Sequence, residues 1–266
     1  MVKPAEFFDS HAVFRFDEFL LAHAASGASP KTTDALLSYY VATGRLTNLR
    51  RGLYARAGGT DPDPWVVGSR LSKDAVIAYD GALTFHGLWP LQHSISFLTR
   101  TRASRFVFDE MIYRPVRLPV ALGKDWGGHI LSLERAGQPL KVTSRERTLV
   151  DLLDRLDLFY GSRALWDCFR AARPDWSELI SYARRLGNRL VVGRLAVFLQ
   201  LLGANNRVLD GLDGFAPRSA CYFDKREPTA GGEIFPRWNV IVSRRLIAHI
   251  ESGAAIDPST VHDEDE

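Results

Sequence analysis

The sequence predicts an α+β fold in two parts, and two observations predict it. A helical pattern that begins at Ser29-Pro30 and ends at Gly44 is followed at once by a short, arginine-rich hairpin pattern, residues 45–56. Beyond residue 65, short β-branched and aromatic runs come first, and longer segments with helical periodicity follow. A helix that leads directly into such a hairpin is typical of a winged helix-turn-helix, so we expect that fold at the N-terminus and a larger mixed α/β domain after it.

The helix over residues 30–43 has clear start and stop signals. Ser29 is a good N-cap, Pro30 fits the first helical position, and Gly44 suits a left-handed C-terminal residue. At 100° per residue, four side chains share the inward face: Thr33, Leu36, Leu37 and Tyr40. Residues 3–11 and the pattern of Phe16, Phe19, Leu20 and His23 predict two helices before it.

The opposite face of this helix is small and weakly polar. It carries Lys31, Ala35, Ser38 and Ala42, with Asp34 at its margin. Small residues let a helix enter a DNA major groove, where alanine contacts a thymine methyl group and serine bonds base edges. An ordinary amphipathic helix is the alternative interpretation.

The hairpin strengthens the DNA interpretation. Arg45, Arg50, Arg51 and Arg56 place four positive charges in twelve residues that contain no acid. Arginine binds phosphate with two hydrogen bonds and enters narrow minor grooves, whereas a solvated basic hairpin is the alternative. We expect the DNA contacts to come from Lys31, Thr32, Ser38, Arg45, Asn48, Arg50 and Arg51.

The Gly- and Pro-rich residues 57–64 predict a linker, so we place the domains at residues 1–57 and 65–250, followed by an acidic, disordered tail at 251–266. In the second domain the expected strands are residues 95–99, 105–112, 116–120, 130–133, 140–142, 221–223 and 238–242. The expected helices are residues 65–71, 80–88, 163–171, 176–186 and 189–202, and one that starts with the capping box Thr143-Ser144-Arg145-Glu146.

Composition is typical of a globular protein, with 46% hydrophobic and 24% charged residues. The last ten residues hold five acids and no Lys or Arg, so the net charge of +3 becomes +8 without them, which favours an anionic partner. Two cysteines without CxxC spacing indicate neither a disulfide framework nor zinc. With no signal peptide and no apolar run long enough to cross a membrane, we expect a cytoplasmic protein.

No catalytic motif stands out, so we expect no catalytic residues, no metal and no cofactor. Two alternatives remain open. One is a nuclease tethered by the winged helix, with Asp224 and Glu233 as its best metal ligands.

His86 lies between aromatic residues and Gly87. This position favours a hydrogen-bonded structural histidine over a general base.

The other alternative is a plain transcription factor whose second domain senses a ligand or partner. A second basic cluster near the C-terminus fits either a nucleic-acid surface or a solvated rim. Its members are Arg218, Lys225, Arg226, Arg237, Arg244 and Arg245.

Three blocks in this order resemble the AbiEi-type antitoxins: Arg51-Gly52-Leu53-Tyr54, then residues 77–88 (IAYDGALTFHGL), then residues 144–153 (SRERTLVDLL). Those proteins are antitoxins and transcriptional regulators paired with nucleotidyltransferase toxins in type IV toxin–antitoxin systems. The resemblance covers about residues 16–156 and implies an N-terminal domain that binds inverted repeats in its own promoter. It also implies a C-terminal domain that counteracts the toxin, without an active site.

We therefore expect a DNA-binding antitoxin that represses its own promoter, with double-stranded DNA as partner and a cognate nucleotidyltransferase toxin as its target. Contact with four to six phosphates predicts a slope of log K against log[salt] of roughly −4 to −5. An inverted repeat implies a dimer or two monomers side by side. The sequence leaves open which of these binds, the operator, and whether the toxin is contacted directly.

Overall fold

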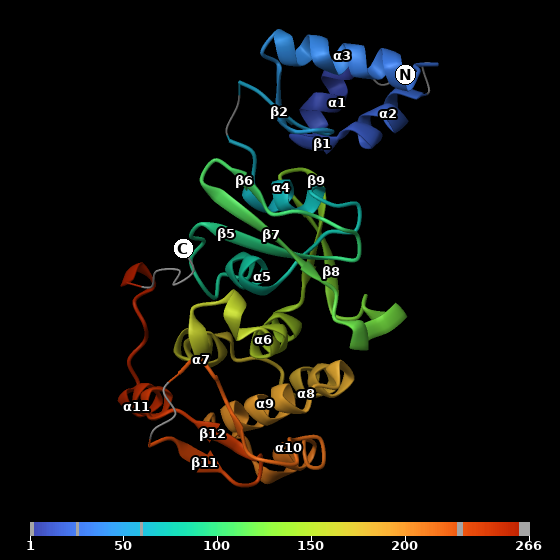
Figure 1. Ribbon diagram of the computed structural model, residues 1–266. Coiled ribbons are helices and arrows are strands. Elements are labelled where there is room, and N and C mark those ends of the chain that lie inside the picture. The colour runs from blue at the N-terminus through green and yellow to red at the C-terminus, as the bar shows by residue number, and fades with distance from the viewer. Residues whose placement is uncertain (1–2, 25–26, 59–60, 228–230, 261–266) are drawn as a thin grey trace. The chain divides into compact units, whose positions relative to one another are not determined.

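The computed structural model describes residues 3–24, 27–58, 61–227 and 231–260. The fold is α+β, as predicted, and the described residues form eleven α-helices and three β-sheets (Figure 1). Gly59 and Thr60 of the expected linker, and residues 261–266 of the acidic tail, lie outside the described residues. None of the described helices is long and apolar enough to cross a membrane.

The N-terminal segment combines three helices with a small antiparallel sheet. Its elements are α1 (Pro4–Ser10), β1 (Val13–Arg15), α2 (Phe16–Ala24), α3 (Pro30–Ala42), β2 (Leu46–Arg50) and β3 (Leu53–Arg56). The strand order is β1-β3-β2, with Phe14 opposite Tyr54. Strand β1 had no counterpart in the sequence prediction. The core beneath these elements is aromatic: Phe7, Phe8, Phe14, Phe19 and Tyr54 pack with Leu37 and Leu46.

Helix α3 forms where the sequence predicts it, for the predicted reasons. The Ser29 hydroxyl accepts a hydrogen bond from the Thr32 amide, and Pro30 occupies the first turn. Gly44 has φ +70°, the left-handed conformation that suits glycine after a helix end. Thr33 and Leu37 are fully buried, so the predicted inward face is confirmed.

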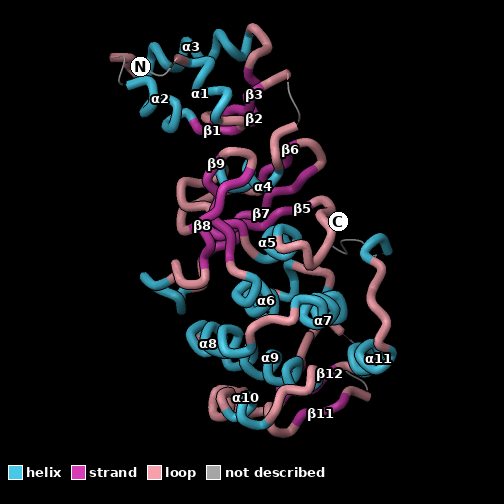
Figure 2. Tube along the Cα trace, turned by 180° about the vertical axis from the view of Figure 1, so that it is seen from behind, coloured by secondary structure: helices cyan, strands magenta, loops and turns pink. Residues whose placement is uncertain are grey.

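A six-stranded sheet follows, in the order β6-β7-β5-β4-β9-β8 (magenta in Figure 2). Its strands are β4 (Val76–Ile77), β5 (Ser94–Thr99), β6 (Phe106–Phe108), β7 (Met111–Arg117), β8 (Ile130–Arg135) and β9 (Gln138–Thr143), with α4 (Pro64–Arg70) packed on it. Strand β5 runs parallel to β7, and β4 parallel to β9. Gly68 lets α4 approach the sheet closely, because a Cβ there would meet Ile77 Cδ1 at 3.0 Å.

Two predicted strands are wrong in this region. Residues 105–112 form not one strand but the hairpin β6–β7, which turns at Asp109 and Glu110, both with positive φ. The predicted strand 116–120 ends early, since β7 stops at Arg117 and a 3₁₀ helix, η1 (Val120–Asp125), follows.

The remaining elements are mostly helical. The helices are α5 (Tyr79–Phe85), α6 (Arg145–Asp154), α7 (Gly161–Ala172), α8 (Trp176–Leu186), α9 (Arg189–Leu201), α10 (Asn206–Asp210) and α11 (Arg244–Ser252). A small sheet joins β10 (Cys221–Tyr222), β12 (Val240–Val242) and β11 (Glu233–Phe235) in that order. Helix α6 begins one residue later than the predicted capping box implies. Its N-cap is Ser144, whose hydroxyl accepts the Arg147 amide, while the Thr143 hydroxyl bonds Thr148.

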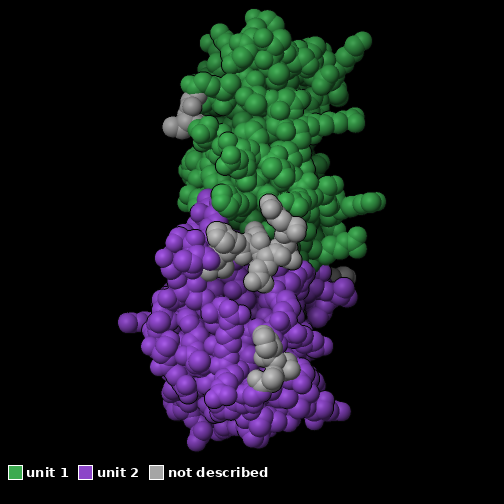
Figure 3. Space-filling model, turned by 60° about the vertical axis from the view of Figure 1, so that its left-hand side comes forward, with its two compact units in different colours: residues 1–77, 93–117, 131–142 green, residues 78–92, 118–130, 143–266 purple. Residues whose placement is uncertain are grey.

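The contacts divide the chain into two units that do not follow the predicted domain limits (Figure 3). The first comprises residues 1–77, 93–117 and 131–142, so the N-terminal segment clusters with most of the central sheet. The second comprises residues 78–92, 118–130 and 143–266. The segment 253–260, expected to be part of a disordered tail, makes specific contacts within that second unit. Gln92 Nε2 donates to the Pro258 carbonyl (2.8 Å), and the Ile256 amide donates to Asp167 (2.8 Å).

Candidate nucleic-acid interface

The outer face of α3 is open to solvent. Lys31, Thr32 and Ser38 are all exposed, and the structure describes no ion pair for Lys31. The Thr32 hydroxyl lies 2.9 Å from that of Ser29 and so helps to cap the helix. This face therefore presents one cation and short hydroxyl side chains, which suits approach to a nucleic-acid groove.

Tyr39 is a candidate contact that the sequence reasoning missed. Its side chain is 60% exposed on α3, and its ring lies edge-on to that of Tyr40 at a centroid distance of 5.6 Å. Helical spacing already places residue 39 beside Ala35 and Ala42. An exposed aromatic ring with a hydroxyl can stack on sugars or bases or donate to a phosphate.

The hairpin that follows α3 places three of its four predicted contact residues on the surface. Arg45, Asn48 and Arg51 are exposed, whereas Leu46 and Leu53 are buried. The Arg45 guanidinium lies 5.9 Å from the centre of the Tyr40 ring, which connects it to α3. These positions bring Arg45 next to the C-terminal end of α3 and leave Arg51 at the hairpin turn.

Arg50 has a different place from the one predicted. Its guanidinium donates to the Leu71 carbonyl and lies 5.4 Å from the centre of the Phe106 ring, and burial lowers its pKa. All three residues belong to the same unit. Arg50 therefore joins the hairpin turn to the central sheet, and we no longer count it among the residues that face DNA.

A buried glutamine makes a second connection between these parts. The Gln138 side chain is fully buried, its Oε1 accepts the Val13 amide (3.0 Å), and its Nε2 donates to the Val13 carbonyl (2.7 Å). The Gln138 side chain thus makes with Val13 of β1 the two backbone hydrogen bonds that a neighbouring strand would otherwise make. Together with Arg50, this contact explains why the N-terminal segment and the central sheet form one unit, which the Gly- and Pro-rich linker did not suggest.

The two carboxylates of the nuclease alternative, Asp224 and Glu233, lie in different surroundings. Asp224 is buried and accepts two hydrogen bonds from the Arg226 guanidinium, at 3.1 and 2.9 Å. Glu227 accepts the hydroxyls of Ser162 and Ser243, and Glu233 is exposed on β11. Among the residues that the structure describes, no three His, Cys, Asp or Glu side chains are grouped so as to hold a metal ion.

The C-terminal basic cluster is partly neutralised. Arg226 pairs with Asp224, and Arg237 pairs with Asp210 (2.6 Å) and Asp213 (2.8 Å). These pairs favour the interpretation of a solvated rim for that part of the cluster. Arg218 is exposed and no ion pair is described for it.

His86 is a hydrogen-bonded structural histidine, as expected. It ends α5, and its Nε2 lies 2.8 Å from the Thr143 carbonyl, to which only a protonated Nε2 can donate. Burial is the largest cause of a lowered pKa at His86. The side chain is therefore neutral at pH 7 and acts as a donor.

This lowered pKa predicts a pH dependence of stability. Between the folded-state pKa and the unfolded value of about 6.5, the unfolded chain binds the extra proton, so the free energy of unfolding falls as the pH drops. We expect the melting temperature to decrease between about pH 7.5 and about pH 5.5, and His86→Gln to reduce that decrease. An equal decrease in wild type and variant would contradict this role. His93→Gln, which changes an exposed histidine, is the matched control.

Comparisons with known proteins show the fold alone. No protein-family model and no curated protein matches the sequence. Among solved structures, the chain resembles the crystal structure of the RV2827C protein from Mycobacterium tuberculosis. The two share 14% sequence identity with a TM-score of 0.58, over 91% of this chain and 89% of that one. The similarity thus extends over both units.

Proposed function

We propose that this chain is a DNA-binding regulator whose residues 3–56 act as a winged helix-turn-helix. The observation that carries the proposal is the element order helix–strand–helix–helix–strand–strand with sheet order β1-β3-β2. In that arrangement α3 is the recognition helix and β2–β3 the wing. The exposed Lys31, Ser38 and Tyr39 on α3 and the exposed Arg45 and Arg51 on the hairpin support it.

The role in the cell follows from the resemblance to AbiEi-type antitoxins. We infer that the chain represses its own promoter in the cytoplasm and counteracts a nucleotidyltransferase toxin, without catalysing a reaction itself. The first motif block, Arg51–Tyr54, forms the turn of the hairpin and the start of β3, and the block at residues 144–153 forms the N-cap and most of α6. Direct binding to the toxin and opposition at the toxin's target are both compatible with this proposal.

Titration against the DNA upstream of the chain's own gene tests the proposal. With the Arg50 guanidinium bonded to the Leu71 carbonyl, three exposed cations remain among the predicted contact residues (Lys31, Arg45 and Arg51), so one bound copy predicts a slope of log K against log[salt] of about −3. We expect Arg51→Ala to bring this slope nearer to zero by about one, measured by fluorescence anisotropy. A flat salt response would refute DNA binding, and equal affinity for random DNA would refute autoregulation.

A further inference from the structure

A groove in the second unit lies between α8 and α10. Its volume is about 500 Å³, within the range of sites that hold small organic ligands. Ser177, Ile180, Ser181 and Arg184 of α8 line one wall, and Arg207, Val208 and Gly211 line the other. We call these seven residues the cationic groove.

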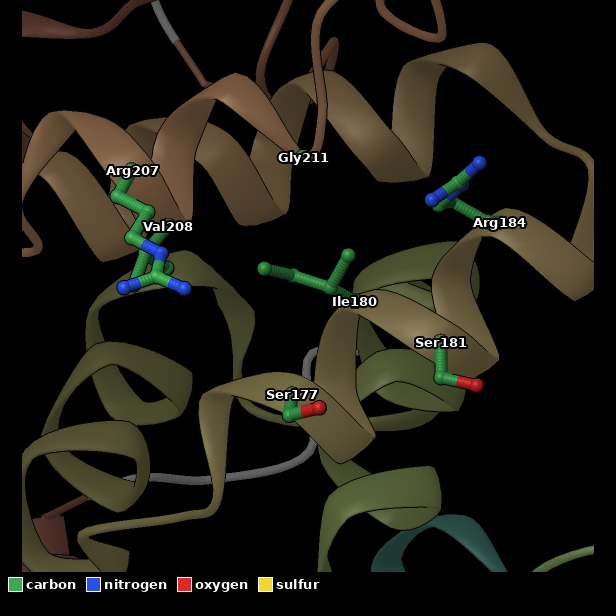
Figure 4. Close-up of a pocket in the computed structure, with 7 residues that line it drawn as sticks. All are labelled: Ser177, Ile180, Ser181, Arg184, Arg207, Val208 and Gly211. Carbon is green, nitrogen blue, oxygen red and sulfur yellow. The ribbon is translucent and has the colours of Figure 1, made fainter.

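The two arginines stand at opposite ends of the cationic groove (Figure 4). Ile180 lies between them, and Ser177 and Ser181 follow the same face of α8, since positions 177, 181 and 184 are spaced by four and three. Phe215 supports one end, because the Arg184 guanidinium lies 4.3 Å from the centre of its ring. The apolar middle is thus flanked by a guanidinium group on each side and by hydroxyl groups along one wall.

Neither arginine is neutralised. No hydrogen bond or ion pair to Arg184 or Arg207 is found among the described residues. The acids on the same helices are engaged elsewhere: Glu178 contacts His129 Nδ1 (3.1 Å), and Asp210 pairs with Arg237 (2.6 Å). The groove therefore keeps its positive charge.

We propose that the cationic groove binds a nucleotide or a similarly extended organic phosphate. Arginine and serine are the side chains that hold phosphate oxygens, arginine with paired hydrogen bonds. A ligand with phosphate at one end and a planar base at the other fits a groove with a guanidinium group at each end, because arginine both binds phosphate and stacks on planar rings. The proposal does not rest on DNA binding by the N-terminal segment.

Calorimetric titration of the full chain with ATP, in the absence of divalent cations and DNA, tests this proposal. We expect saturable binding that Arg184→Gln/Arg207→Gln weakens at least about tenfold, because the phosphate contact and the stacking contact are both lost. Arg218→Gln is the matched control: it removes an exposed arginine of the same unit outside the groove, and we expect its affinity to stay within about twofold of wild type. Inorganic phosphate should bind at least about tenfold more weakly than ATP.

Ser177→Glu gives a second test that does not threaten folding. The residue is exposed in the first turn of α8, where an acidic side chain is favourable to the helix. We expect an unchanged melting temperature and loss of ATP binding by charge repulsion. Absence of ATP binding to the wild type, unchanged binding in the double or Ser177→Glu variant, or phosphate binding as tight as ATP would each overturn the proposal.

Discussion

Replacing Asp151 by alanine is expected to destabilise the second unit by about 3–5 kcal/mol, because it leaves a buried guanidinium without its partner. Arg147 is fully buried and Asp151 almost so, and Arg147 Nε lies 3.2 Å from Asp151 Oδ2. The Tyr182 hydroxyl donates to Asp151 Oδ1 at 2.6 Å. Burial and the nearby Asp151 charge raise the pKa of Tyr182, so the hydroxyl keeps the proton that it donates.

We attribute the loss of stability in Asp151→Ala to the unpaired charge and not to a change in the helix. A control variant separates the two causes. Asp154→Ala removes a carboxylate from the same helix, where it accepts one hydrogen bond from Asn188 at the surface (2.7 Å). We expect that change to cost about 1 kcal/mol. Urea denaturation followed by tryptophan fluorescence compares the two variants, and equal losses would contradict the account.

Replacing all three interacting side chains by apolar ones tests whether the unpaired charge causes the loss of stability. Arg147→Met/Asp151→Leu/Tyr182→Phe leaves neither an unpaired charge nor an unpaired hydroxyl, so it should be more stable than Asp151→Ala alone. Recovery is incomplete, because Arg147 also donates to the carbonyls of Trp126 (2.6 Å) and Gly128 (2.7 Å). A triple variant no more stable than the single one would show that packing, and not charge, sets the loss.

The sequence predicted best those features that depend on neighbouring residues. Ser29, Pro30 and Gly44 define α3 through local capping, and the four inward residues follow from helical spacing alone. The hairpin at residues 105–117 was missed because its turn uses Asp109 and Glu110 with positive φ, where glycine or asparagine is the usual signal. The N-cap of α6 was misplaced by one residue because Thr143 and Ser144 are both good caps.

The parts of the candidate sites that depend on distant residues could not be read from the sequence. Nothing near Arg50 indicates that its guanidinium meets Leu71 and Phe106, which lie 21 and 56 positions further on. The cationic groove is similar, because Ser177, Ser181 and Arg184 share one helix face by spacing but Arg207 reaches them only through the packing of a second helix. Local patterns therefore gave the bounds and the inward face of α3, whereas tertiary contacts decided which arginines remain exposed.

Replacing Ser38 by glutamate is expected to lower DNA affinity by roughly 100-fold, because it places a carboxylate on the face of α3 that we propose enters the major groove of DNA. Like charges brought together at an interface cost several kcal/mol, and each 1.4 kcal/mol is a factor of ten. Ser38 is exposed within the helix, and glutamate has a higher helix propensity than serine, so folding should be preserved. Fluorescence anisotropy on the promoter duplex measures the loss, and circular dichroism checks the fold.

The matched control adds the same charge where the proposal predicts no effect. Val120 is 96% exposed and belongs to the second unit, so Val120→Glu changes the net charge equally without touching α3. A loss of affinity shared by both variants would mean that overall charge, and not this helix face, governs binding. An unchanged affinity in Ser38→Glu alone would remove α3 from the interface and require another surface of the first unit to carry the DNA contact. A large loss confined to Ser38→Glu is the result that the exposed, small-residue face of α3 predicts, since only there does the added carboxylate meet phosphate or base edges at close range.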